Sequence, residues 1–184
     1  MSVSMSQTGP IIGVFASDRG PGDPERASLM SQVGTLFARR GARLICLAEK
    51  GAIPVPLITA ARAAGGAVDI LADASIVLPP ALETVPITIL PERGERYARL
   101  GDMAGAFVAL PGSLASVSAL FGSWTVAKPK PVVMLNRHRA FEVVRGFAGD
   151  VLSHALPGYD KNLQFADSVE DLWNKVVWVG EQRR

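Results

Sequence analysis

The segment from residue 105 to residue 121 joins an apolar run to a helical pattern through a tight turn. The apolar run covers 106–110 and ends at Pro111-Gly112. Apolar residues then recur at the spacing of one helix face. These residues are Leu114, Val117, Leu120, Phe121 and Trp124. Ser113 stands at the helix N-cap position, so the segment predicts a buried strand, a turn and an amphipathic helix.

The same turn is the first candidate for a binding site. A strand that feeds a helix N-terminus leaves unpaired backbone N–H groups and the positive end of the helix dipole facing one point, where phosphate groups bind. The residues concerned are Gly112, Ser113, Leu114, Ala115 and Ser116. The alternative is an ordinary turn between a strand and a helix, and the residues alone leave both interpretations open.

Short apolar runs alternate with helical patterns along the whole chain. Strands are predicted at 11–15, 43–47, 68–71, 87–90, 106–110, 131–135 and 163–166. Helices are predicted from Asp23 to Gly41, at 55–64, 92–103, 113–126 and 141–152, and from Asp167 or Ser168 to about 177. This alternation favours βαβ units. We therefore expect a Rossmann-like, doubly wound α/β fold, with a mainly parallel sheet, helices on both faces, and ligands beyond the carboxyl ends of the strands.

Length and composition are those of an ordinary globular protein. The chain has 184 residues, of which 48% are hydrophobic and 20% charged, and its formal net charge is +2. A chain of this length suits one domain. We expect a flexible N-terminal tail over 1–9 and a single domain over 10–180.

Several classes of partner and cofactor are disfavoured. The arginines are scattered, so we expect no nucleic-acid partner. No apolar stretch approaches the roughly 18 residues of a membrane span, and the Ser-rich start lacks a signal-peptide pattern, so we expect a cytoplasmic protein. Cys46 lies in an apolar run and is predicted to be buried. Because Cys46, His138 and His154 do not have metal-site spacing, we expect no metal and no cofactor.

Residues 110–119 resemble the Pro-Gly-Gly-x-Gly-Thr-x-x-Glu signature of the LOG family, the cytokinin-activating nucleoside 5′-monophosphate phosphoribohydrolases. Glu95-Arg96 stands where that family has part of its Met-x-x-Arg-Lys motif. The segment 130–136 is similar to the family's Lys-Pro-Val-x-x-Leu-Asn strand, and 165–175 to its closing strand and helix. The resemblance covers most of the chain. It implies the family's fold and a homodimer paired through helices that flank the active cleft.

The signature departs from the family pattern at the positions that carry its chemistry. Ser113 and Ala115 replace glycines, Ser116 replaces Thr, and Ala119 replaces the catalytic Glu. Tyr97 replaces the Lys of the second motif. The resemblance therefore implies that the carboxylate of the family's Arg/Glu pair is missing.

Arg96 is the strongest single candidate for a functional residue. By the resemblance, its guanidinium clamps the phosphate of a ligand, and a planar fork suits bidentate contact with phosphate. The alternative is a solvated basic face shared with Arg93 and Arg99, which lie at intervals of three.

Two further loops contribute candidates. Ser17, after the first strand, has two possible roles: donating to a phosphate or ribose oxygen, or stabilising its own loop. Lys50 lies in the turn that replaces the family's glycine-rich loop after the second strand. Its possible roles are to supply a charge to the ligand or to form a surface ion pair with Glu49.

These observations predict a LOG-like protein that binds a nucleoside monophosphate or sugar phosphate, with weak or no hydrolysis. Cleavage of an N-glycosidic bond needs a carboxylate near the developing sugar cation, and Ala119 supplies none. The alternative is an active phosphoribohydrolase whose acid comes from Glu49, Glu92 or Glu95. The apolar helix that carries Phe121 supports the expected homodimer.

Overall fold

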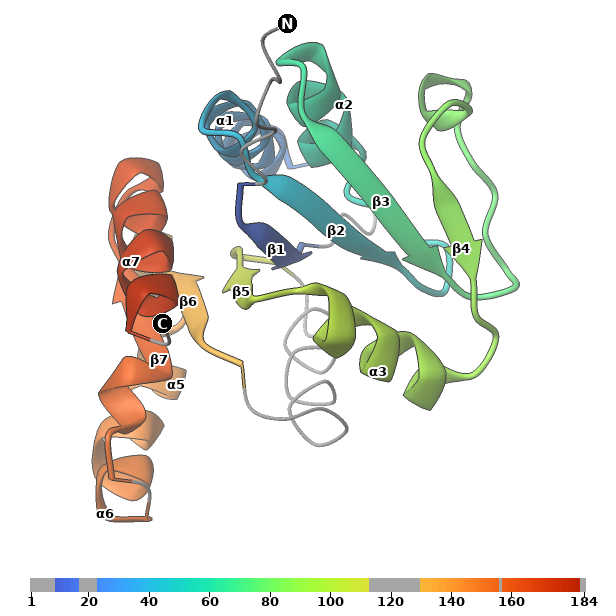
Figure 1. The fold of residues 1–184 in the computed structure, drawn as a ribbon. Coiled ribbons are helices and arrows are strands. Elements are labelled where there is room, and N and C mark those ends of the chain that lie inside the picture. Colours follow the sequence, from blue (N-terminus) through green and yellow to red (C-terminus); the bar gives the residue numbers. More distant parts are fainter. Residues whose placement is uncertain (1–8, 17–22, 113–129, 156, 183–184) are drawn as a thin grey trace, which may run out of the picture.

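The computed structural model describes residues 9–16, 23–112, 130–155 and 157–182. Its centre is a seven-stranded sheet in the order β4-β3-β2-β1-β5-β6-β7, and all of its strand pairs are parallel (Figure 1). The strands are Ile11–Phe15 (β1), Arg43–Ala48 (β2), Ala67–Ala72 (β3), Ile87–Ile89 (β4), Ala106–Ala109 (β5), Val132–Leu135 (β6) and Leu163–Ala166 (β7). The predicted Rossmann-like α/β fold is confirmed.

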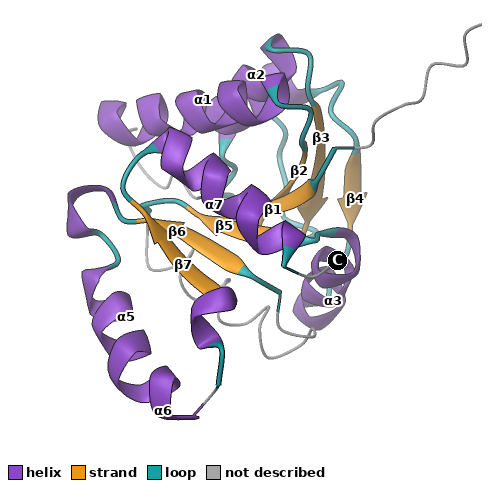
Figure 2. Cartoon of the chain, turned by 60° about the vertical axis from the view of Figure 1, so that its left-hand side comes forward, coloured by secondary structure: helices purple, strands orange, loops and turns teal. Residues whose placement is uncertain are grey.

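Helices cover both faces of this sheet (Figure 2). The α-helices are Pro24–Arg39 (α1), Val55–Ala63 (α2), Arg93–Met103 (α3), Glu142–Phe147 (α5), Ser153–Ala155 (α6) and Val169–Glu181 (α7). Met30 of α1, Leu57 of α2 and Val176 of α7 join one buried cluster, which also contains Cys46. Leu100 of α3 joins a second buried cluster. Successive residues of β2 alternate between the two clusters, as the period of a strand requires.

The helix boundaries follow from capping residues that the sequence supplies. The Asp23 side chain accepts a hydrogen bond from the Glu25 N–H at 3.0 Å and so caps α1. Beyond the end of α1, Gly41 has a φ of 81°, which glycine adopts without a steric penalty. The Ser168 hydroxyl accepts from the Asp171 N–H at 3.1 Å and caps α7. These contacts place both helices where the sequence predicts that they begin.

Two predicted helices differ from those observed. The helix predicted over 141–152 is helical but not α-helical throughout, because a π-helical segment, Ala148–Leu152, lies between α5 and α6. Gly146 and Gly149 weaken the α-helix in this stretch. The final helix runs to Glu181 rather than ending near 177, because Val179 is buried and continues its inner face.

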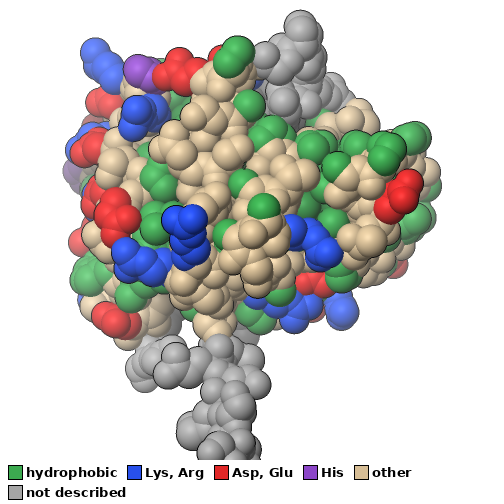
Figure 3. Space-filling model, turned by 90° about the horizontal axis from the view of Figure 1, so that it is seen from above, with side chains coloured by type: hydrophobic (Ala, Val, Ile, Leu, Met, Phe, Trp, Pro, Cys, Tyr) green, Lys and Arg blue, Asp and Glu red, His purple; other side chains and the backbone are tan. Residues whose placement is uncertain are grey.

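The surface carries both charge signs in mixture. On the face shown in Figure 3, Lys and Arg side chains are interspersed with Asp and Glu and do not gather into one basic stripe. The pair Arg40–Glu170, at 2.8 Å, joins α7 to the end of α1. Within the described ranges, no helix is long and apolar enough to cross a membrane.

Candidate functional site

The carboxyl ends of all seven strands lie at one edge of the sheet. Along the chain, β1, β2, β3 and β4 are added in turn toward one side of the sheet. The next strand, β5, returns to the other side of β1 and pairs with it through Phe15 and Ala109. The neighbours β1 and β5 therefore form the switch point of the sheet, beside which doubly wound folds bind their ligands. The Leu110 N–H donates to the Phe15 carbonyl oxygen at 2.9 Å and extends the pairing to the turn.

Several predicted site residues lie outside the described residues. They are Ser17, Ser113, Leu114, Ala115, Ser116 and Ala119. Of the predicted phosphate turn, Gly112 is described; it is partly buried and lies shortly after the end of β5 at Ala109. Lys50 and Arg96 are also described, after β2 and near the start of α3.

Arg96 is buried at the carboxyl edge, with only 4% of its surface exposed. Its Nη1 donates to the carbonyl oxygens of Leu90 and Pro91 at 2.6 and 2.7 Å. Its Nε donates to Oε1 of Glu49 at 3.2 Å. Arg93 and Arg99 are exposed. The interpretation of Arg96 as part of a solvated basic face is therefore wrong.

Glu49 lies between Arg96 and a buried phenol. The Tyr97 hydroxyl donates to Oε2 of Glu49 at 3.3 Å. Arg93 Nε donates to the Tyr97 oxygen at 2.9 Å, and the Arg93 guanidinium lies 5.0 Å from the ring centroid. Burial raises the pKa of Tyr97, so the phenol stays protonated near neutral pH. We call Glu49, Arg93, Arg96 and Tyr97 the Glu49 cluster.

A tight turn holds Glu49 in place. Lys50 and Gly51 have φ values of 51° and 76°, and the Ala52 N–H donates to the Glu49 carbonyl oxygen at 2.9 Å. Two central residues at positive φ define a type I′ turn. The Lys50 N–H donates to Asp73 after β3 at 2.8 Å. Two loops that follow neighbouring strands therefore fix each other, as their common edge in Figure 1 allows.

Asp73 is held as an acceptor by its own loop. Its Oδ1 accepts from the Ser75 hydroxyl at 2.5 Å and from the Ser75 N–H at 3.0 Å. The Ser75 hydroxyl is the largest cause of a lowered Asp73 pKa, and the Lys50 N–H adds to it. The Glu49 turn therefore rests on a carboxylate that stays ionised at neutral pH.

A cavity of about 140 Å³ lies beside Pro111, between the start of α1 and the loop after β6. Its lining includes Arg26, Arg137 and His138 together with Glu25. His138 Nε2 contacts the Glu25 carboxylate and links the two segments across the cavity. The charges around this cavity are mixed, so it does not by itself indicate an anion site.

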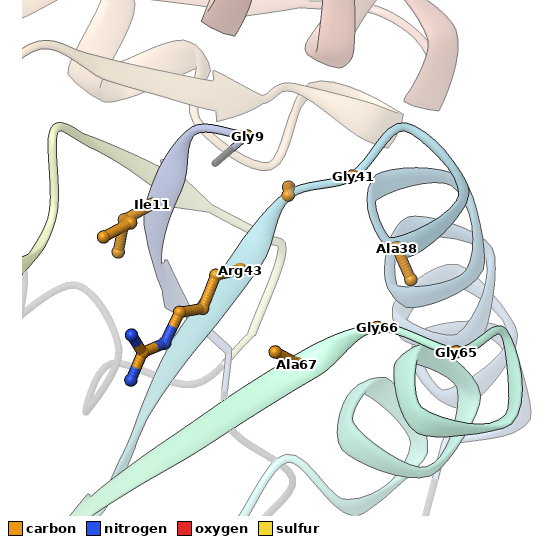
Figure 4. Close-up of a pocket in the computed structure, with 9 residues that line it drawn as sticks. Gly9, Ile11, Ala38, Gly41, Arg43, Gly65, Gly66 and Ala67 are labelled. Atoms are coloured by element: carbon orange, nitrogen blue, oxygen red, sulfur yellow. The ribbon is translucent and has the colours of Figure 1, made fainter. Parts of the chain in front are cut away.

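A larger cavity, of about 310 Å³, lies at the opposite, amino edge of the sheet. Its lining contains four glycines, and Arg43 is its one charged residue. These glycines are Gly9, Gly41, Gly65 and Gly66. Figure 4 shows the Arg43 guanidinium directed toward the side of Ile11, away from Gly65 and Gly66. Arg43 Nε pairs with Asp69 at 2.7 Å. The larger hollow thus offers a ligand one charged side chain, which is already paired.

The described groups permit recognition more readily than bond cleavage. Cys46 is fully buried, and burial raises its pKa to about 12, so its thiol is not a nucleophile at neutral pH. Among the described residues, no group of three or more His, Cys, Asp or Glu side chains is placed to hold a metal ion. Glu92 and Glu95 are exposed, so of the three glutamates weighed as a relocated acid, only Glu49 reaches Arg96.

The contact of Glu49 with Arg96 was not part of the sequence prediction, which offered Lys50 as the partner of Glu49. The two paired residues lie 47 positions apart. A signal for the contact was present, because Glu49 directly follows β2 and Arg96 lies in the first turn of the helix after β4. In a parallel sheet both positions meet at the carboxyl edge.

The sequence comparison supports a relationship over the whole chain. No protein-family model matches it. A curated cytokinin riboside 5′-monophosphate phosphoribohydrolase from Mycobacterium tuberculosis is 26% identical over 179 residues, which cover 93% of this chain and 96% of that relative. This match confirms the resemblance to the LOG family that the sequence motifs predict.

Solved structures share the fold. The molybdenum cofactor carrier protein from Chlamydomonas reinhardtii matches with a TM-score of 0.70 at 17% identity, covering 92% of this chain and 97% of its own. The molybdenum cofactor binding protein from Rippkaea orientalis matches with a TM-score of 0.68 at 16% identity, covering 94% and 98%. At these identities the matches establish the architecture alone.

Proposed function

We propose that this protein binds a phosphorylated small molecule, a nucleoside monophosphate or a sugar phosphate, at the carboxyl edge and hydrolyses it weakly or not at all. The observation that carries the proposal is the burial of Arg96 and its pairing with Glu49. This arginine is buried at the ligand-binding edge, and the carboxylate beside it comes from the loop after β2. The chain thus keeps, at the carboxyl edge, the arginine that matches the family motif. It lacks the family's catalytic glutamate, because Ala119 stands at that position.

The proposed phosphate position is the turn after β5. Backbone N–H groups from Gly112 to Ser116, at the start of the helix that the sequence predicts, suit an anion. Arg96 is proposed to contribute to the same site, because it is buried at the carboxyl edge and its contacts with Glu49, Leu90 and Pro91 hold the guanidinium there. Ser17 and Lys50 are proposed to complete the polar lining from the loops after β1 and β2.

The carboxylates near Arg96 do not favour efficient hydrolysis. Removing a positioned general acid or base costs about 10²–10⁴-fold in rate. Glu49 is the described carboxylate that contacts Arg96, and each of its oxygens already accepts a hydrogen bond. The named relatives include an enzyme and a carrier, so both turnover and carriage are roles compatible with this fold.

Isothermal titration calorimetry tests the binding. We expect adenosine 5′-monophosphate and ribose 5-phosphate to bind, and adenosine, which lacks the phosphate, to bind about tenfold more weakly or worse. Arg96→Lys should weaken the binding of both phosphorylated compounds, while Arg43→Lys at the amino edge should not. An absence of heat with every phosphorylated compound would show that the proposal is wrong.

A base-release assay separates binding from hydrolysis. We expect little free adenine from adenosine 5′-monophosphate with the natural chain, and a gain on Ala119→Glu. The alternative function, phosphoribohydrolase activity with Glu49 as the relocated acid, predicts robust release that Glu49→Gln abolishes. Glu95→Gln, an exposed carboxylate on α3, is the matched control.

We also propose a homodimer. The segment around Phe121, which the sequence predicts to be helical, lies outside the described residues, but a second apolar stripe supports association. Val143, Phe147 and Val151, four residues apart, are 87%, 53% and 43% exposed. Light scattering should give twice the mass of the 19.5 kDa chain, and Phe147→Asp should shift the mass toward one chain. A natural chain that remains a monomer at micromolar concentration would contradict the proposal.

A further inference from the structure

Glu49 occupies a distinctive place in this architecture. It directly follows β2, and β2 pairs with β1 at the switch point. In dinucleotide-binding sheets an Asp or Glu after the second strand accepts a hydrogen bond from a ribose hydroxyl, with the phosphate on the loop after the first strand; here the proposed phosphate turn follows β5, on the other side of β1. Two strand spacings, about 10 Å, separate β2 from β5 and its phosphate turn. Glu49 therefore lies beside the switch point, on the opposite side of β1 from the proposed phosphate turn, where the remainder of a phosphorylated ligand would extend.

The carboxylate is held in one orientation from several directions. Arg96 fixes Oε1 and the Tyr97 hydroxyl fixes Oε2. The backbone beneath it is the type I′ turn whose Lys50 N–H donates to Asp73. Groups that are positioned by their surroundings before a ligand arrives recognise it with little ordering cost.

Both carboxylate oxygens still have room for a second donor. An ionised carboxylate offers about four acceptor positions, and the two internal contacts use two of them. The Glu49 side chain is 17% exposed, whereas that of Arg96 is 5% exposed. The Glu49 carboxylate is therefore more accessible than the Arg96 guanidinium, and the contacts among the described residues leave each of its oxygens capacity for a second donor.

The positive charge of Arg96 offsets the repulsion that Glu49 alone would exert on a nearby phosphate. An isolated glutamate beside an anion would repel it. Here the guanidinium contacts the carboxylate at 3.2 Å, so the pair as a unit has no net charge. Glu49 can then accept from neutral hydroxyl groups without opposing an anion two strands away.

We infer that Glu49 is a specificity-determining residue that accepts hydrogen bonds from the vicinal hydroxyl groups of a ribose. This inference rests on the proposed function and narrows it: the ligand carries a free 2′-hydroxyl as well as a 5′-phosphate. A 2′-deoxy ligand leaves one acceptor position unfilled. A site built to bind a hydroxyl group discriminates against a ligand that lacks it.

Calorimetry with adenosine 5′-monophosphate and 2′-deoxyadenosine 5′-monophosphate tests the inference. The natural chain should bind the ribose compound about 10- to 100-fold more tightly, the range of one hydrogen bond to a charged group. Glu49→Gln should bring the two affinities within about threefold of each other by weakening only the ribose compound. Glu95→Gln should leave the discrimination unchanged.

The results of this titration distinguish a failure of this inference from a failure of the proposed function. Equal and measurable affinities of the natural chain for the two compounds overturn the inference and leave phosphate binding intact. Binding of neither compound overturns both. Discrimination that survives in a folded Glu49→Gln assigns the hydroxyl contact to another residue and also overturns the inference. Thermal unfolding of the variant establishes that it is folded, and the comparison within the natural chain requires no substitution.

Discussion

The two edges of the same sheet present opposite kinds of hollow. The amino edge has the larger cavity, about 310 Å³, lined by four glycines and by an arginine already paired with Asp69. The carboxyl edge has a cavity of about 140 Å³ and, nearby, the Glu49 cluster, in which Arg96 and Tyr97 are buried. Volume favours the first edge, while the convergence of buried polar groups favours the second.

This difference shows that converging buried polar groups, rather than cavity volume, indicate the functional edge. At the amino edge, Gly9 lies where chain segments approach closely: a Cβ on it would lie 2.0 Å from the Gly41 carbonyl oxygen. Close packing or backbone conformation therefore explains these glycines, since Gly41 and Gly65 have φ values of 81° and 82°. Burying Arg96 and Glu49 instead costs desolvation energy. A fold does not need this cluster in order to pack, which is why we assign the ligand to the carboxyl edge.

The largest expected effect is a difference in stability between substitution of Arg96 at the carboxyl edge and of Arg43 at the amino edge. Arg96→Ala should lower the free energy of unfolding by about 3 kcal/mol, because it leaves the partly buried Glu49 without its cation. Arg43→Ala should cost less than about 1 kcal/mol, because Arg43 pairs with Asp69 in a more exposed position. Urea unfolding measures both. Similar losses for the two variants would contradict the contrast between the edges.

The fold itself was largely predictable from the sequence, because its signals are local. The run of residues 43–47 predicts β2 to within one residue, and Asp23 followed by Pro24 fixes the start of α1. The helix over 141–152 was predicted less well. Its apolar spacing is helical, but the exposure of Phe147 and the π-helical segment depend on contacts that spacing does not encode.

The candidate site was predictable only in part. Arg96 was identified from its resemblance to a family motif, but its burial was not, because Arg93 and Arg99 share its spacing and are exposed. The Glu49 contact depends on which strands are neighbours and how far each loop extends. Those relations are set by the register of the sheet, and no pattern within either segment reports them.

The next effect concerns packing at the amino edge. Gly9→Ala should destabilise the protein by about 1–3 kcal/mol, as overpacking does, since the new Cβ meets backbone at 2.0 Å. Affinity for adenosine 5′-monophosphate should not change in the folded variant. Gly105→Ala is the matched control, because its Cβ would lie 3.8 Å from the Ile11 oxygen. A loss of affinity in Gly9→Ala would move the site toward the amino edge.

Cys46, in the middle of β2, gives a pH test. Its pKa rises from 9.0 to about 12 on folding because of burial, so above pH 9 the unfolded chain loses a proton that the native chain keeps. Stability is complete below pH 9 and falls as the pH rises. The natural chain should lose about 1.4 kcal/mol more between pH 8 and pH 10 than Cys46→Ala does. Parallel pH profiles would show that the thiol is not buried.

The smallest effect tests the turn that carries Glu49. Gly51→Ala should cost about 1 kcal/mol, because Gly51 has a φ of 76° that alanine adopts with strain. Gly94→Ala, in the first turn of α3 with open space around its Cβ, should be neutral or stabilising by up to about 1 kcal/mol. Calorimetric melting compares them. Equal effects would mean that the turn is not held in this conformation.

The central claim is that the carboxyl edge, and not the larger hollow, receives a phosphorylated ligand. Titration of isotope-labelled protein with adenosine 5′-monophosphate, followed by amide chemical shifts in nuclear magnetic resonance spectra, tests this residue by residue. We predict shifts at Glu49, Arg96 and Gly112, with Gly41 and Gly66 unchanged. Shifts concentrated at Gly41 and Gly66, with Glu49 and Arg96 unmoved, would contradict the claim.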